Sequence, residues 1–353
     1  MYYQYTRYII TANFFLIFVM VWLEITLAGR DSYFSDAEYY FLAGFRESGA
    51  CLDYDGSLLV CLYRALSFSE YNYFLFLLLF ILSYIAVIIS ALRHLKSEKF
   101  KLVVAVFLFH PFIAFLIARG MKELLFILPL MLYLISLNWN KYGNGWIVIF
   151  VSSAFIFYLR PLGGYLAIAI LLGSMFLNAR YLWLSLVICL AVPLLLEYLP
   201  VVNDNLISHR LGFSDRDLTV QSIPAPIIFF FGPTPIRPIL AMLGDFMYAF
   251  GTPITLYVLL IGSFFSINCA FLMPRYILFQ IKNYALIQRY LFLSALSLIS
   301  IYSFIYGGAV DTRHRGLFFC MLGTLVLITL VKQSNKDELT KEDHEKRLLT
   351  YRH

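Results

Sequence analysis

Four side chains that could bind an anion or move a proton lie close together near the C-terminal end of the chain. Asp311, Arg313, His314 and Arg315 belong to the segment 307–316, which stands between two long apolar runs. An ionisable group next to a membrane helix needs a partner, water or an anionic ligand. The cluster therefore predicts a functional site at the end of such a helix.

The composition indicates a polytopic membrane protein. Hydrophobic residues make up 61% of the chain and charged residues only 14%, with a mean hydropathy of +0.79. These values exclude a soluble globular domain. The net charge of +6 is what Lys and Arg on cytoplasmic loops would produce, so we predict no nucleic-acid partner.

The apolar runs predict an all-α bundle of about ten transmembrane helices. Each run is close to the length that spans about 30 Å of hydrocarbon. We treat residues 1–331 as one membrane domain and 332–353 as a charged cytoplasmic tail. The predicted spans are 8–28, 71–92, 102–118, 121–138, 145–159, 163–178, 181–199, 243–272, 284–306 and 316–331.

The distribution of basic residues predicts the orientation, because short cytoplasmic loops carry an excess of Lys and Arg. Both termini are then cytoplasmic, which agrees with an even number of spans. The residues that fall on the same face are Arg7, Arg93, Lys96, Lys99, Lys101, Lys141, Arg180, Arg275, Lys282, Arg289 and the basic residues of the tail.

Two longer segments, 30–70 and 200–244, are predicted on the outer face. In the first, Ser35 and Glu38 have the spacing of a capping box, which predicts a short juxtamembrane helix over 36–48. In the second, the stretch 224–238 is apolar but rich in proline, so it cannot form a continuous helix. We interpret it as a re-entrant or interfacial element.

The five cysteines show no metal-binding spacing. Cys51 and Cys61 fall on the outer face, where either a disulfide or two free thiols is possible. The other three are interpreted as small apolar core residues.

Basic residues also gather at the predicted outer helix ends, against the positive-inside tendency. Arg119 and Lys122 lie in a short turn before an apolar run, Arg160 precedes another, and Arg237 ends the proline-rich stretch. The planar guanidinium of Arg can donate to two phosphate oxygens at once and Lys adds a compact charge, so phosphate is the ligand that this pattern favours.

Four short stretches resemble motifs of the bacterial integral-membrane glycosyltransferases of the GT-C-like group that use polyprenyl-linked sugars. The layout is most similar to the O-antigen and capsule repeat-unit polymerases (Wzy-type). The stretches are the acidic, Tyr-rich Ser-Asp36-Ala-Glu38-Tyr39-Tyr40, the turn Arg119-Gly-Met-Lys122-Glu123, Phe-Gly-Pro233-Thr-Pro235, and Asp311-Thr-Arg313-His-Arg315.

The resemblance implies sugar transfer from a polyprenyl diphosphate on the outer face of a bacterial inner membrane. The partners would be that lipid-linked oligosaccharide, the bilayer and other polysaccharide-assembly proteins. The leaving diphosphate needs fixed positive charge and the attacking hydroxyl needs a base. The candidate bases are Asp36, Glu38 and His314, and the candidate diphosphate ligands are Arg119, Lys122, Arg160, Arg237, Arg313 and Arg315.

Several alternatives remain open at this point. No cofactor is required, although the carboxylates of Asp31, Asp36 and Glu38 leave a divalent cation as a second possibility. A transporter or flippase of lipid-linked sugars is the second function, and a scaffold subunit of an export assembly is the third. His110-Pro111 predicts a kink with a hydrogen-bonded imidazole in preference to a catalytic base.

Overall fold

The computed structural model describes residues 2–27, 70–118, 161–197, 253–306 and 312–350, together with the single residues 147, 150, 151, 154 and 230. Every regular element in this part of the chain is a helix, and it contains no strand, so the predicted all-α class is confirmed there. The helices are α1 (Tyr2–Leu27), α4 (Glu70–Leu92), α5 (Glu98–Leu108), α6 (Pro111–Ala118), α9 (Pro161–Phe176), α10 (Ala179–Glu197), α15 (Pro253–Tyr276), the 3₁₀ helix η3 (Leu278–Asn283), α16 (Leu286–Tyr306) and α17 (Thr312–Thr350).

Proline sets the start of three of these helices. Pro111, Pro161 and Pro253 are the first residues of α6, α9 and α15. Proline has no N–H to donate, and the first helical position is the one where that donor has no partner inside the helix. The predicted span 102–118 is consequently two helices, α5 and α6, separated by a break at Phe109 and His110.

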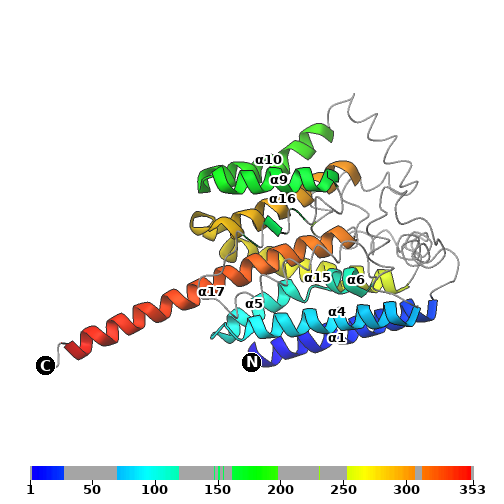
Figure 1. Cartoon of the computed structure of the whole chain (residues 1–353), viewed down its shortest axis with the longest axis horizontal. Helices are drawn as coiled ribbons and strands as arrows, with labels where there is room; N and C mark the ends of the chain where they lie inside the picture. The colour runs from blue at the N-terminus through cyan, green and yellow to red at the C-terminus, as the bar shows by residue number, and fades with distance from the viewer. Residues whose placement is uncertain are drawn as a thin grey trace.

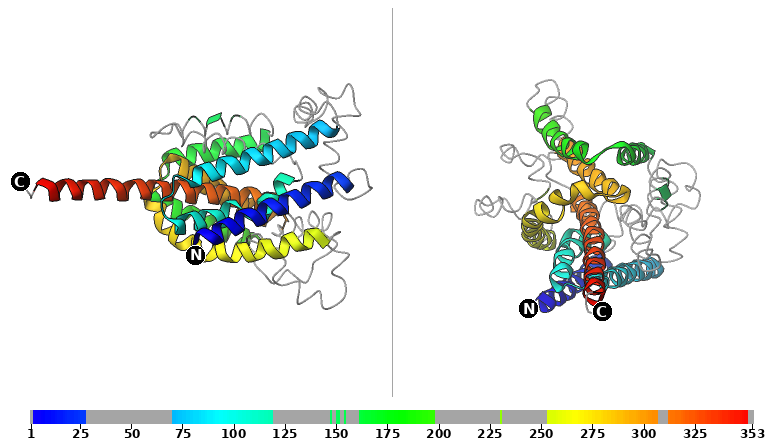
Figure 2. Two further views of the ribbon diagram at one scale, coloured as in Figure 1. Left: turned by 90° about the horizontal axis from the view of Figure 1, so that it is seen from below. Right: turned by 90° about the vertical axis from the view of Figure 1, so that its left-hand side faces the viewer.

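Helix α17 lies at the centre of the bundle. It packs against α16 on one side and against α5, α6 and α15 on the other (Figure 1). Helices α1 and α4 pack beside α5 and α6, and α9 and α10 pack on α16. Seen end-on in Figure 2, α17 has the other helices around it. Its C-terminal part projects beyond them as a long straight helix.

Glycine allows α17 to approach its neighbours closely. A Cβ on Gly316 would lie 2.5 Å from the carbonyl oxygen of Phe112, and one on Gly323 would lie 2.5 Å from Leu108 Cδ2. Both distances are well inside van der Waals contact, so only glycine fits. Small residues at contacts between apolar helices let the backbones pack at short range.

The connections between successive helices fall at two ends of the bundle. The start of α1, the α4–α5 turn, the α9–α10 turn and η3 lie at the end from which α17 projects, which we call the tail end (Figures 1 and 2). The start of α17 and the end of α6 lie at the opposite, mouth end. Many of the basic residues that the sequence grouped on one face belong to tail-end segments.

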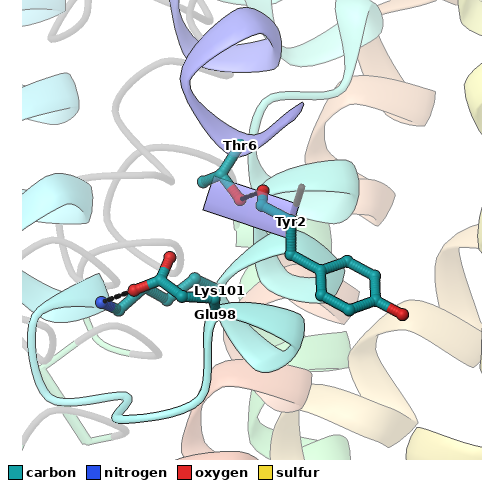
Figure 3. Close-up of polar contacts among 4 residues, drawn as sticks. All are labelled: Tyr2, Thr6, Glu98 and Lys101. Carbon is teal, nitrogen blue, oxygen red and sulfur yellow. Dashed lines mark hydrogen bonds and ion pairs between the residues drawn. The ribbon is translucent and has the colours of Figure 1, made fainter. Parts of the chain in front are cut away.

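Polar contacts at the tail end lie both within single helices and between them. Figure 3 shows two local examples: Thr6 Oγ1 donates to the Tyr2 carbonyl at 3.0 Å, and Lys101 forms an ion pair of 2.6 Å with Glu98. Arg289 of α16 donates to the carbonyl oxygen of Leu177, which follows α9, at 3.0 Å. This bond ties α16 to the turn between α9 and α10.

Large apolar side chains are exposed on the described bundle, and a few polar ones are buried in its mainly apolar interior. Phe271 is 81% exposed and Phe176 is 77% exposed, while His110 and Arg315 are 0% exposed. Exposed apolar side chains of this size are uncommon on the surface of a soluble monomer when they form large patches.

The number of spans remains a prediction. In the described part of the chain, Arg315–Ser334 is the one helix whose length and composition suffice to cross a membrane. The predicted spans 121–138 and 145–159 lie outside the described residues apart from the single positions of the second. Four shorter helical stretches are also apolar: Leu78–Leu92, Leu166–Phe176, Arg180–Ala191 and Leu286–Ile301.

The close approach of α17 to α6 and α5 predicts that Gly316→Ala and Gly323→Ala destabilise the protein. Overpacking of this kind costs about 1–3 kcal/mol, because a backbone or a packed side chain must move. The midpoint of thermal unfolding in detergent measures the effect. Gly173→Ala is the matched control, since the nearest atoms to its new Cβ are 3.7 Å away. Equal midpoints for all three variants would show that the α17 contacts are looser than described.

Candidate functional site

The break between α5 and α6 is a polar place in the mainly apolar interior of the described bundle. Helix α5 ends at Leu108, Phe109 has φ −101° and ψ 32°, and α6 starts again at Pro111. A break leaves carbonyl groups without helical partners, and in apolar surroundings each such group must be bonded by other means. Side chains from other helices supply those bonds.

Two of the freed carbonyls are bonded from α1 and α4. Asn13 Nδ2 donates to the carbonyl oxygen of Phe109 at 2.6 Å, and the Tyr84 hydroxyl donates to that of Leu108 at 3.4 Å. The Tyr84 oxygen is also 3.8 Å from Cys320 Sγ of α17. The break is therefore held by side chains that are distant in sequence.

His110 is fixed on both edges and on one face. Its Nδ1 accepts the backbone N–H of Phe112 at 3.2 Å, which caps the first turn of α6. The ring proton of a neutral imidazole is then on Nε2, which donates to Ser266 Oγ of α15 at 3.2 Å. The ring also stacks on Phe319 of α17, with centroids 3.8 Å apart and planes at 7°. The predicted kink with a hydrogen-bonded imidazole is confirmed.

Arg315 is four residues before Phe319 and is thus about one turn nearer the start of α17. It is completely buried, and its guanidinium carbon lies 5.6 Å from the centroid of the Phe112 ring. That distance is within the range of a cation–π interaction. Phe112 also packs against Gly262 of α15, where a Cβ would lie 2.3 Å from its ring. Phe112 thus joins α6 to both α15 and α17.

The mouth end brings the end of α6 next to the start of α17. A Cβ on Gly316 would lie 3.0 Å from Leu116 Cβ, and the two helices run in opposite directions. Arg119 is the next residue after α6, and Arg313 and His314 are in the first turn of α17. Pro161, which follows Arg160, starts α9 on the far side of α16.

The structure describes few of the predicted site side chains. Arg315 is the one candidate whose side chain it places, and it lies in the interior beside Phe112. Arg313 and His314 have a described helical backbone, with side chains outside the described set. The remaining candidates lie outside the described residues: Asp36, Glu38, Arg119, Lys122, Arg160 and Arg237.

One residue of the proline-rich stretch 224–238 is described. Phe230 is buried, and its ring centroid lies 5.4 Å from that of Phe319 and 5.8 Å from that of Phe318. Phe319 is the residue that stacks on His110. A side chain of this stretch therefore reaches the core beside the helix break.

The described cysteines agree with a packing role. Cys189, Cys269 and Cys320 are free thiols, and the last two are buried. Among the described residues no three His, Cys, Asp or Glu side chains are grouped as a metal site would require. The alternative cation site at Asp31, Asp36 and Glu38, and the Cys51–Cys61 pair, lie outside these residues.

The polar contacts of the break include residues that sequence reasoning did not select. Asn13 and Ser266 are single polar residues in apolar runs, and such a residue indicates a hydrogen-bond partner somewhere in the interior. The sequence does not identify that partner, because Asn13 is 96 positions from Phe109 and Ser266 is 156 from His110.

No family model matches the chain, and no curated protein or solved structure is significantly similar to it.

We expect removal of the Asn13 amide to lower the stability of the protein measurably. In Asn13→Ala the buried carbonyl of Phe109 loses its donor, which costs about 1–3 kcal/mol. The thermal midpoint in detergent should fall accordingly. Asn268→Ala is the control, because Asn268 Nδ2 bonds the Phe264 carbonyl within its own helix at 2.8 Å and is exposed. A control variant that falls as far as Asn13→Ala would argue against a special role of the break.

Proposed function

We propose that the chain is a polytopic membrane glycosyltransferase of the polysaccharide-polymerase kind. It transfers sugar or oligosaccharide units from a polyprenyl diphosphate at the outer face of a bacterial inner membrane. The observation that carries this proposal is Arg315, a guanidinium that is fully buried at the start of an apolar helix. A buried charge in a membrane bundle is expensive and marks a functional site.

The start of α17 has an unusual charge distribution that favours an anion. Its first turn contains Arg313, His314 and Arg315 and no acidic residue. A helix N-terminus already carries partial positive charge from its free N–H groups, so cations there are unfavourable by themselves. A diphosphate bound at this end would be stabilised by both the side chains and the helix.

The proximity of α6 to α17 supports a shared site for cations from distant parts of the sequence. Arg119 and Lys122 follow α6 directly, and the end of α6 packs beside the start of α17. We propose that these two residues join Arg313 and Arg315 around the diphosphate. Arg160, which precedes α9, and Arg237, which lies in the proline-rich stretch, would be further ligands of the diphosphate.

The reaction then needs one displacement and one proton transfer. An acceptor hydroxyl oxygen forms a bond to the anomeric carbon, and the bond from that carbon to the lipid diphosphate breaks. The hydroxyl proton passes to Asp36 or Glu38, or to His314, and the diphosphate leaves with the electron pair. Fixed cations stabilise the charge that develops on the leaving group.

A transporter or flippase of lipid-linked sugars is the second candidate. The observation in its favour is the discontinuous helix α5–α6 with polar groups in the bundle interior, a feature of many transporters. The same cations would then bind the diphosphate headgroup without chemistry.

Substitution at Arg313 separates the two candidates. For the polymerase, Arg313→Ala should shorten surface polysaccharide chains while single repeat units still reach the surface. For the flippase, all export should fall. Gel analysis of surface polysaccharide measures both, with protein level checked by immunoblot. Arg313→Lys keeps the charge without the planar fork and should be intermediate. Arg180→Ala, an exposed tail-end arginine, is the control.

A direct assay decides whether chemistry occurs at all. Purified protein incubated with a polyprenyl-diphosphate oligosaccharide should form longer lipid-linked products, detected by mass spectrometry. Wild-type chain lengths in Arg313→Ala and Arg315→Ala, together with no product from the purified protein, would remove the proposal.

The predicted orientation of the chain in the membrane can be tested with reporters fused at different positions. Fusions after Lys101 should report cytoplasm, and fusions after Gly212 should report the outer side. The reason is that short loops rich in Lys and Arg stay inside. The same side for both fusions would contradict the assigned topology.

A further inference from the structure

His110 contacts three helices, although only one of its contacts is needed to cap α6. It caps α6 through Nδ1, bonds Ser266 of α15 through Nε2 and stacks on Phe319 of α17. Capping alone would satisfy the first turn of α6. The other two contacts instead fix the direction in which α6 leaves the break.

We propose that His110 is a positioning residue: together with Ser266, it holds α6 so that its mouth end stays against the first turn of α17. The effect on catalysis rests on the proposed function, in which Arg313 and His314 of the first turn of α17 belong to the site. It assigns His110 no contact with substrate. Its effect reaches the site through α6.

The length of α6 makes such control effective. The helix has eight residues and spans only about 12 Å. A tilt of about 10° at His110 would therefore move the far end of α6 by about 2 Å. Displacements of about 1 Å at a reacting centre can cost about a hundred-fold in rate.

Phe112 links this tilt to the cation on α17. Its ring lies beneath Arg315, its carbonyl lies against Gly316, and its ring edge packs on Gly262. The ring centroids of His110 and Phe112 are 4.8 Å apart. A shift of His110 therefore moves the surface on which Arg315 rests.

The Ser266 hydroxyl can be tested with a pair of variants of equal shape. Ser266→Thr keeps a hydroxyl, whereas Ser266→Val has a methyl group in its place. Both side chains are one heavy atom larger than that of serine, so any overpacking is common to the pair. The difference between the two variants reports the His110–Ser266 bond.

The readout is a photo-crosslink that does not depend on activity. With p-benzoylphenylalanine at position 116, on the side of α6 that faces Gly316, irradiation of native membranes should join α6 to the start of α17, as mapped by mass spectrometry. We expect Ser266→Val to lower this yield about five-fold relative to Ser266→Thr, in line with the loss of one hydrogen bond. A second crosslinker at position 177, beside Arg289 of α16, should be unaffected.

Two results would overturn the inference. The first is an equal yield at position 116 for the valine and threonine variants. The second is an equal loss at positions 116 and 177, which would mean general loosening of the bundle. If both sets of yields follow expectation, the KM for the lipid-linked donor should also be higher in Ser266→Val than in Ser266→Thr. No product from wild-type protein would defeat the proposed function and leave the crosslinking result standing.

Discussion

The structure depends on one constraint, that every backbone polar group inside an apolar bundle must be bonded. Helical segments meet it within themselves, but the chain between Leu108 and Pro111 cannot. Asn13, Tyr84 and Ser266 meet it from α1, α4 and α15, either directly on the carbonyls or through His110. Because α17 adds Phe319 and Cys320 to the same place, the break fixes the relative positions of most of the described helices.

Within the described residues, the sequence was sufficient to predict most of the helices, but it did not predict the break in 102–118 as two helices or which helices would pack together. Apolar runs and the prolines at 111, 161 and 253 locate the described helices, and His110-Pro111 correctly indicated a kink. Helices that are apolar on all sides give no sign of which face turns inward. Arg315 was grouped with Arg313 and His314 by proximity alone, and only the structure places it beside Phe112 in the interior.

Apolar side chains both inside and outside the described bundle explain why small and polar residues carry the packing information. With apolar side chains such as Phe264 and Phe271 on the outside, burial of apolar area cannot by itself select one arrangement over another. Close contacts at Gly316 and Gly323, and hydrogen bonds at the break, do distinguish between arrangements. The specificity of this fold therefore lies in a few residues, several of them far apart in sequence.

The positive charge of Arg315 at the start of α17 is energetically costly. A guanidinium at the positive end of a helix is opposed by the helix dipole, and burial adds a cost of desolvation. Phe112 offsets part of that cost through its ring, and it is held there by the glycines of α15 and α17. Inside the first turn of a helix, acidic side chains complement the dipole, whereas α17 has Arg313, His314 and Arg315 there. The proposed anion site would offset both costs, because a bound diphosphate would interact favourably with the guanidinium and with the helix end.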